Sequence, residues 1–260
     1  MTSKTEIPES DAASYFDALM SACGFLTRLP IPFRNVPIHR AAWAFPMAGV
    51  VVGCVAGGLL WGGLAIGLPP LAASILAFIA SALVTGALHE DGLADCADGF
   101  WGGTTPERRL EIMRDSRSGA YAVLALVLVS GLKIVLLASV AAQWGGLAGA
   151  TVLVGLHAVS RSVLPIAMNW LPPAGTSGLA VMAGRPSLAT ACFSLGLGAA
   201  ISLIVPGWMG IAFVPAGLAV VLAVGYLAKA KLNGINGDSL GAMEQMAEVM
   251  GLLVLTVLMS

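Results

Sequence analysis

Charged side chains are scarce in this chain. Asp, Glu, Lys and Arg make up 10% of its 260 residues, and apolar residues make up 58%. A soluble domain is about 25% charged and roughly 45–50% apolar. With a mean hydropathy of +0.90, the shortage of charge excludes an ordinary soluble domain and predicts a protein that crosses a membrane several times.

The chain also lacks an excess of either charge and the cysteine spacing of a disulfide framework. Its 13 basic and 14 acidic residues leave a net charge of −1, so no nucleic acid partner is expected. The polar, acidic N-terminus has no basic segment followed by an apolar core, so no cleavable signal peptide is expected. Four distant cysteines without a Cys-x-x-Cys pair favour free thiols: Cys23, Cys54, Cys96 and Cys192.

Seven apolar stretches approach or exceed the length of about 20 residues that a helix needs to cross a bilayer. We therefore expect an all-α fold, a polytopic integral membrane bundle of about seven transmembrane helices. The fifth stretch is short and glycine-rich and is the weakest of the set. The expected spans are Ala41–Ile66, Pro70–Leu88, Gly119–Ala141, Ala148–Met168, Leu188–Val205, Gly210–Ala228 and Leu240–Leu258.

Basic residues set the expected orientation. With the N-terminus in the cytoplasm, every Lys and Arg of the connecting segments falls on the cytoplasmic side and none in the outside turns. We expect a cytoplasmic segment over residues 1–40, with an in-plane amphipathic helix near Ser10–Arg28, and a single transmembrane domain over residues 41–260. The same orientation brings four polar segments to the cytoplasmic face: 89–99, 107–118, 170–187 and 229–239.

The stretch His89–Gly99 follows the second span and carries four carboxylates. On a helix, Asp91, Asp95 and Asp98 share one face, where like charges repel. A divalent metal would relieve this repulsion, and Mg²⁺ prefers one or two carboxylates together with substrate phosphates. With Glu90 as a fourth ligand, the pattern predicts a metal site for phosphate chemistry at the bilayer surface. A solvated helix end and a transporter's ion pathway are the alternatives.

Arginines lie near the cytoplasmic ends of the third and fourth expected spans. Arg114 and Arg117 flank Asp115 just before the third span, and arginine clusters hold phosphate oxygens in bidentate fashion. An ordinary solvated charged helix is the alternative there. Arg161 lies inside the fourth span, four residues after His157. A charge at that depth is costly, so it faces a partner or a polar cavity, or its side chain snorkels to the interface.

A second carboxylate group opens the last span. Two Asn-Gly pairs precede Asp238, as in a loop that ends at a helix N-terminus. Asp238 is either the helix N-cap or a carboxylate that binds metal or orients a nucleophile. Glu244 and Glu248 lie one and two turns further and are expected to face the bundle interior. For Lys133, inside the third span, a structural ion pair and a functional role are both open.

Five segments resemble, in order, the motifs of the cobalamin synthase family of adenosylcobinamide-GDP ribazoletransferases. Phe25–Pro32 is similar to the N-terminal Thr-Arg-[Leu/Ile]-Pro motif and Phe45–Gly49 to the entry of the first span. His89–Gly99 resembles the signature His-x-Asp-Gly-Leu-x-Asp-x-x-Asp-Gly. Met113–Gly119 resembles Met-[Lys/Arg]-Asp-Ser-Arg-x-Gly, and Gly237–Ala242 resembles Gly-Asp-x-Leu-Gly-Ala.

The resemblance implies a Mg²⁺-dependent transferase of a bacterial inner membrane, with its catalytic domain over residues 41–260 and its active site on the cytoplasmic face. Adenosylcobinamide-GDP and α-ribazole, or its 5′-phosphate, would give adenosylcobalamin, or its 5′-phosphate, and GMP. A homo-oligomer and association with other enzymes of the pathway are both compatible with it. The expected metal ligands are Glu90, Asp91, Asp95 and Asp98. The expected phosphate-binding residues are Arg28, Arg114, Arg117 and Arg161. The expected catalytic carboxylates are Asp91, Asp95, Asp115 and Asp238.

Two other functions compete with this interpretation. A CDP-alcohol phosphotransferase also places Asp-rich motifs at a membrane helix end, but its signature continues Asp-Gly-x-x-Ala-Arg, and no such Arg follows Gly92. An ion or corrinoid transporter would need polar residues along several spans toward the outside. The outer halves of the expected spans are apolar, which disfavours a transporter.

Overall fold

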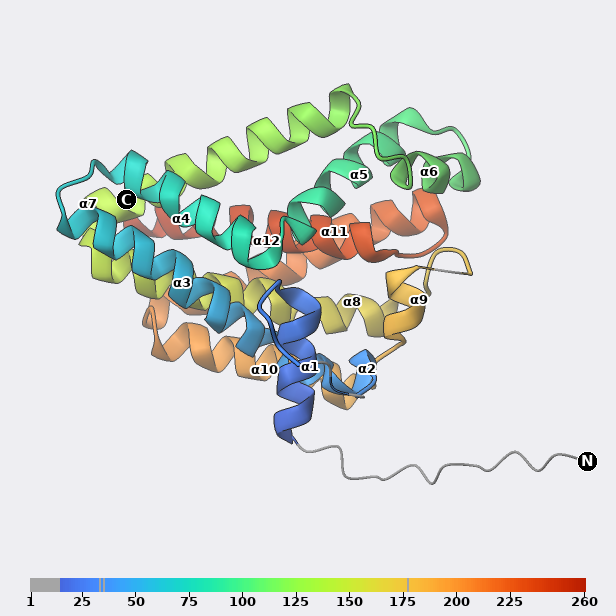
Figure 1. Cartoon of the computed structure of the whole chain (residues 1–260), viewed down its shortest axis with the longest axis horizontal. Coiled ribbons are helices and arrows are strands. Elements are labelled where there is room, and N and C mark those ends of the chain that lie inside the picture. The colour runs from blue at the N-terminus through green and yellow to red at the C-terminus, as the bar shows by residue number, and fades with distance from the viewer. Residues whose placement is uncertain (1–14, 33, 35, 177) are drawn as a thin grey trace, which may run out of the picture.

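The computed structural model describes residues 15–32, 34, 36–176 and 178–260, and these are helical without a β-strand (Figure 1). The expected all-α fold is confirmed. The elements are α1 (Tyr15–Leu26), α2 (Ile38–Ala41), the 3₁₀ helix η1 (Ala42–Ala44), α3 (Phe45–Ala65), α4 (Pro70–Thr85), α5 (Leu88–Gly102), α6 (Pro106–Met113), α7 (Ala120–Ser162), α8 (Leu164–Trp170), α9 (Leu179–Ala183), α10 (Leu188–Ile204), the 3₁₀ helix η2 (Trp208–Ala212), α11 (Phe213–Leu232) and α12 (Gly237–Met259).

Within the described residues, four helical stretches are long and apolar enough to cross a membrane, or five if the bent pair α4 and α5 is one span. The stretch 120–170 contains two expected spans, because α7 breaks at Gly145 (φ 81°, ψ 175°). There the chain folds back, and a Cβ atom on Gly149 would lie 3.8 Å from the Cα atom of Ala141. The fifth expected span forms the 17-residue α10. All seven expected segments are helical, and the chain is a multi-pass membrane protein.

Small residues fix the contact between α3 and the second arm of α7. A Cβ atom on Gly53 would lie 2.6 Å from the Cα atom of Val154, and one on Gly57 would lie 2.9 Å from the carbonyl oxygen of Ala150. Glycines at four-residue spacing allow two membrane helices to approach to backbone contact. The contact sets the depth of the second arm, which carries His157 and Arg161.

A sharp elbow separates the second span from the acidic motif. Gly86 (φ 65°) and Ala87 (φ 56°) both adopt left-handed conformations, and α5 leaves α4 at 89°. The Arg28 side chain lies on Gly86, where an added Cβ atom would come within 2.6 Å of Nε, and the Arg28 amide donates to the Val84 carbonyl at 2.7 Å. The elbow therefore turns α5 away from the direction of α4, and α5 packs against α12.

The N-terminal helix is present as α1, while residues 10–14 of the expected amphipathic helix lie outside the described residues. The apolar residues Cys23 and Leu26 of α1 are buried against the bundle, and Phe16 is exposed. Part of the apolar face therefore packs on protein. The in-plane placement of α1 and the domain limits 1–40 and 41–260 stay predictions.

Candidate functional site

The four polar segments that were expected to share one membrane face meet at one end of the bundle. This end carries α6 and α9 and lies to the right in Figure 1. The Arg109 guanidinium donates from Nη1 to the Lys231 carbonyl at 2.9 Å. The Ile235 amide donates to the Pro172 carbonyl at 2.9 Å. Residues far apart in sequence can therefore contribute to a single site.

Helices α5 and α12 touch at two glycines. A Cβ atom on Gly92 would lie 2.9 Å from the Asp238 carbonyl oxygen and 3.2 Å from the Cα atom of Gly241. Only glycine permits so close an approach without displacing backbone. The contact brings Asp91 and Asp95 of α5 to the first turn of α12, where Asp238 lies.

The N-cap of α12 is Asn236, so the N-cap alternative for Asp238 is wrong. The Asn236 Oδ1 atom accepts from the Ser239 amide at 2.9 Å, and its Nδ2 donates to Asp238 Oδ2 at 2.7 Å. The amide that caps the helix thus also orients the Asp238 carboxylate, which leaves that carboxylate free to serve the site. An asparagine two positions before Asp238 was the sequence signal for this arrangement.

The carboxylates of α5 and α12 repel one another. The pKa of Asp95 is raised to about 7, first by its burial and then by the charges of Asp238, Asp91 and Asp98. A cation among these groups would reverse both effects, because an opposite charge favours the ionised form. All the donors are oxygen atoms, which are the ligands that Mg²⁺ prefers. The donor atoms are therefore of the type that suits a magnesium ion, although no three of these carboxylates lie within 4.8 Å of one another.

Two of the four expected metal ligands are engaged elsewhere. Asp98 accepts from the Gly119 amide at 2.5 Å and from the Ala122 amide at 3.0 Å, and so caps α7. Glu90 is buried, and its Oε1 atom accepts from Gln245 Nε2 at 3.2 Å. Of the four expected ligands, Asp91 and Asp95 remain available to bind a metal beside Asp238.

The arginines and Asp115 divide into two groups. Arg117 and Asp115 are exposed and pair with each other at 2.6 Å, and the hydrogen bonds from Arg117 lower the pKa of Asp115 to about 2. So low a pKa makes Asp115 a poor proton acceptor at neutral pH. Arg114 lines a pocket of about 510 Å³ together with Asn236 and Asp238. Arg28 is exposed at the elbow of α4 and α5.

A second, mainly apolar pocket, with about 650 Å³ of empty space including open solvent, adjoins the first at Asp238. Helices α1, α3, α5, α8, α9 and α12 enclose it, and Asp91, Asp238 and His89 are its polar lining residues among those described. Both this pocket and the one with Arg114 are lined by Leu179, Gly237 and Asp238. Sequence reasoning missed this pocket, because its walls come from six helices and no local pattern joins them.

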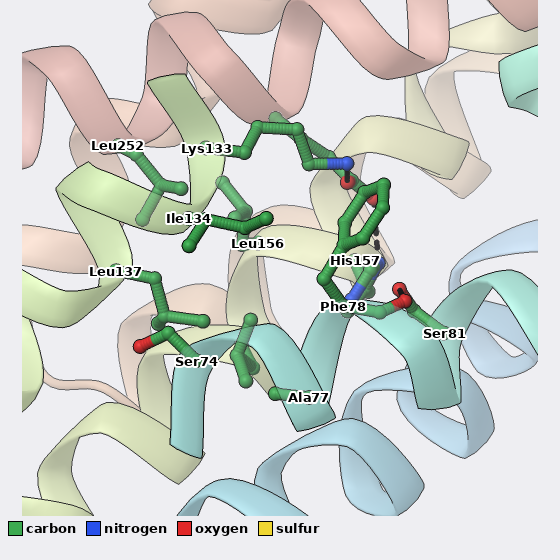
Figure 2. A pocket seen from close by; sticks show the side chains of 12 residues that line it. Ser74, Ala77, Phe78, Ser81, Lys133, Ile134, Leu137, Leu156, His157 and Leu252 are labelled. Carbon is green, nitrogen blue, oxygen red and sulfur yellow. Dashed lines mark hydrogen bonds and ion pairs between the residues drawn. The ribbon is translucent and has the colours of Figure 1, made fainter. Parts of the chain in front are cut away.

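A buried charge network lies deeper in the bundle, beside a small cavity lined by Lys133 and His157 (Figure 2). Arg161 Nη1 lies 2.6 Å from Glu244 Oε1, and Lys133 Nζ lies 2.5 Å from Glu248 Oε2. His157 Nδ1 lies 2.5 Å from Glu248 Oε1. As expected, both glutamates face the interior. Arg161 faces partners there and does not snorkel, and Lys133 forms a buried ion pair.

This network contains the one group of three metal-ligand side chains within 4.8 Å among the described residues: His157, Glu244 and Glu248. The two carboxylates are already neutralised by Lys133 and Arg161. A divalent ion there would meet two fixed positive charges, which would oppose its binding. Arg161 is only 1% exposed. The contacts therefore indicate that the network is structural and that Arg161 lies out of reach of a substrate phosphate.

Comparisons with known proteins match nearly the whole chain. A family model described as cobalamin-5-phosphate synthase matches residues 18–256. A curated Brucella anthropi protein named adenosylcobinamide-GDP ribazoletransferase is 42% identical over 243 residues, covering 87% of this chain and 91% of the relative. A Brucella canis protein of the same name is 42% identical over 247 residues, covering 88% and 92%. No solved structure matches the chain.

Proposed function

The chain belongs to the cobalamin-5-phosphate synthase family, and we propose that it acts as an adenosylcobinamide-GDP ribazoletransferase, as its relatives are named. It joins adenosylcobinamide-GDP to α-ribazole, or to its 5′-phosphate, and gives adenosylcobalamin, or its 5′-phosphate, and GMP. The observation that carries the proposal is the glycine contact of α5 with α12, which gathers Asp91, Asp95 and Asp238 beside the pocket that Arg114 lines.

Asp91 and Asp95 would hold Mg²⁺ together with phosphate oxygens of the donor. The raised pKa of Asp95 supports this assignment, because burial first and then the charges of three neighbouring carboxylates oppose its ionisation, and a bound cation would offset both. When bound, the ion supplies charge neutralisation at the diphosphate. Glu90 and Asp98 keep their hydrogen bonds to Gln245 and to the start of α7.

The chain's own groups position and neutralise the reacting atoms, which is most of what phosphoryl transfer requires. Arg114 binds donor phosphate oxygens from its pocket, whereas Arg117 and Arg28 are exposed and do not line that pocket. A ribose hydroxyl oxygen of the acceptor forms a bond to the phosphorus that carries the corrinoid side chain. The bond from that phosphorus to the bridging oxygen of GMP breaks, and GMP leaves with the electron pair.

Asp238 takes the proton of the attacking hydroxyl. It lines both pockets, so it can lie between donor and acceptor. It accepts a hydrogen bond from the neutral Asn236 and forms no ion pair with a described residue, whereas Asp115 is paired with a guanidinium. A carboxylate without a cationic partner is the better proton acceptor of the two.

The reaction takes place at the cytoplasmic face of a bacterial inner membrane. The support is the absence of Lys and Arg from the connections at the opposite end of the bundle. Family membership favours the transferase over both a CDP-alcohol phosphotransferase and a transporter. Association with other enzymes of the pathway would keep the corrinoid near this face.

The test is turnover by the purified protein in liposomes with adenosylcobinamide-GDP, α-ribazole and Mg²⁺, with cobalamin and GMP separated by chromatography. Asp91→Asn and EDTA should each abolish both products. Glu111→Gln removes one carboxylate from an exposed pair with Arg108 and should leave the rate unchanged. Folded wild-type protein that forms neither product, or that keeps its rate in EDTA, would contradict the transferase or the metal assignment, respectively.

A further inference from the structure

The apolar pocket beside the acidic residues fits one part of the substrates. It is a concave, mainly apolar site with a few polar groups, as small-molecule sites usually are. We propose that it binds the benzimidazole base of α-ribazole, with the ribose hydroxyls directed to Asp91 and Asp238. This inference rests on the proposed function and adds which surface selects the acceptor base.

Polarity decides which part of the two substrates enters this pocket. Apart from His89, Asp91 and Asp238 at one end, every described lining residue is apolar or glycine. Guanine carries hydrogen-bonding groups along its edge, and a corrin ring carries amide side chains around its rim. Either would leave polar groups without partners in such a pocket, which is costly. A methylated benzimidazole presents mainly carbon, so it loses little on entering.

The walls of the pocket suit a flat ring. The rings of Phe25 and Phe45 both line the pocket and stack on each other, with centroids 6.1 Å apart at an interplanar angle of 19°. Leu164 and Met168 of α8 add further apolar lining, and both are almost completely buried. Aromatic and thioether groups make favourable contacts with aromatic ligands. These side chains come from α1, α3 and α8 and lie apart from the acidic motif.

The donor substrate binds in a different pocket. The pocket of about 510 Å³ with Arg114 and Asn236 meets the apolar pocket at Asp238 and Gly237. Its cationic and amide groups suit phosphate and guanosine, which the apolar pocket does not. Changes in the apolar pocket should therefore alter acceptor binding and leave donor binding unchanged.

Two methionine substitutions test this separation. Met168→Gln places an amide of similar size in the apolar pocket, and Met182→Gln makes the same change at an 80% exposed position on α9 that does not line it. For Met168→Gln, KM for α-ribazole should rise at least about 10-fold, the scale of losing one apolar contact. The preference for α-ribazole over the α-riboside of adenine should fall, and KM for adenosylcobinamide-GDP should not change. Met182→Gln should match wild type in all three.

A second pair covers the case in which Met168→Gln does not fold. Phe25→Leu removes an aromatic ring from the pocket and Phe193→Leu removes one from the exposed surface of α10. Only Phe25→Leu should raise KM for α-ribazole. Equal acceptor KM values for the folded pocket and control variants would overturn the proposal. A rise in donor KM alone would assign the pocket to the donor instead.

Equilibrium dialysis of α-ribazole against the wild-type protein separates this inference from the proposed function. If wild type shows no turnover but binds α-ribazole, and Met168→Gln does not bind it, the reaction is rejected and the base pocket is retained. Turnover by wild type with acceptor binding unaffected in Met168→Gln and Phe25→Leu would reject the pocket alone.

Discussion

The contact between α5 and α12 makes Gly92→Ala a sharp test of the site. The added Cβ atom would lie 2.9 Å from the Asp238 carbonyl oxygen, 3.0 Å from its Cα atom and 3.2 Å from the Cα atom of Gly241. All three are backbone atoms, so the helices must separate by several tenths of an ångström. Overpacking of this kind lowers the free energy of unfolding by about 1–3 kcal/mol. The higher helix propensity of alanine offsets up to about 1 kcal/mol of this loss. The net loss of stability should be about 0–3 kcal/mol.

Gly92→Ala should lower kcat as well as stability. Separation of the helices moves Asp91 and Asp95 away from Asp238, and a misplacement of about 1 Å can cost about 100-fold in rate. The assay is kcat in liposomes beside thermal unfolding in detergent. Gly102→Ala is the matched control on the same helix, since its Cβ atom would meet only Ile112 Cδ1 at 3.5 Å. If Gly92→Ala keeps the kcat of Gly102→Ala, the helix contact does not assemble the site.

Three further predictions concern residues around the site. Asp98→Asn weakens the charged cap of α7 and should lower stability by about 1 kcal/mol, measured by thermal unfolding against Glu111→Gln, which should show no change. The pKa of Asp115 is about 2, below its usual 3.8, so its stabilising effect is present above pH 3.8 and lost as pH falls toward 2; Asp115→Asn should leave the pH profile of kcat near neutrality unchanged, and a shifted profile would make Asp115 the base. Lys133→Met removes one cationic partner of the buried Glu248, which keeps Arg161 at 3.3 Å, so it should destabilise by less than the roughly 3–5 kcal/mol of a fully unpaired buried charge. Adding Glu248→Gln should restore part of this loss; no restoration would show that the pair does not stabilise the bundle.

Local patterns in the sequence predict the positions of helices well, but they predict poorly which residues contact one another across helices. The apolar runs locate all seven helical segments, and the i, i+4, i+7 spacing places Asp91, Asp95 and Asp98 on one α5 face, because both depend on the helical repeat. The cap that Asp98 provides to α7 depends on Gly119, 21 residues away. Neither that contact nor the burial of Glu90 against Gln245 has a local signal.

The elbow before α5 shows the same limit in the backbone. An alanine in the left-handed region, as at Ala87 (φ 56°), is disfavoured by roughly 1–2 kcal/mol, so propensity alone predicts a continuous helix. The conformation depends on the surrounding packing, including Arg28 over Gly86. The family resemblance identifies the acidic motif that follows the elbow. Only the three-dimensional structure shows that this motif packs against the helix that carries Asp238.

The buried charges connect this geometry to the membrane-embedded part of the fold. Glu248 of α12 binds Lys133 and His157 from the two arms of α7, and Glu244 binds Arg161. These pairs fix how far α12 extends toward the end of the bundle. Asp238 lies six residues before Glu244, about 9 Å along the helix at 1.5 Å per residue. The network therefore sets the level at which the Asp238 carboxylate meets α5, which gives costly buried charges a positioning role without any contact to substrate.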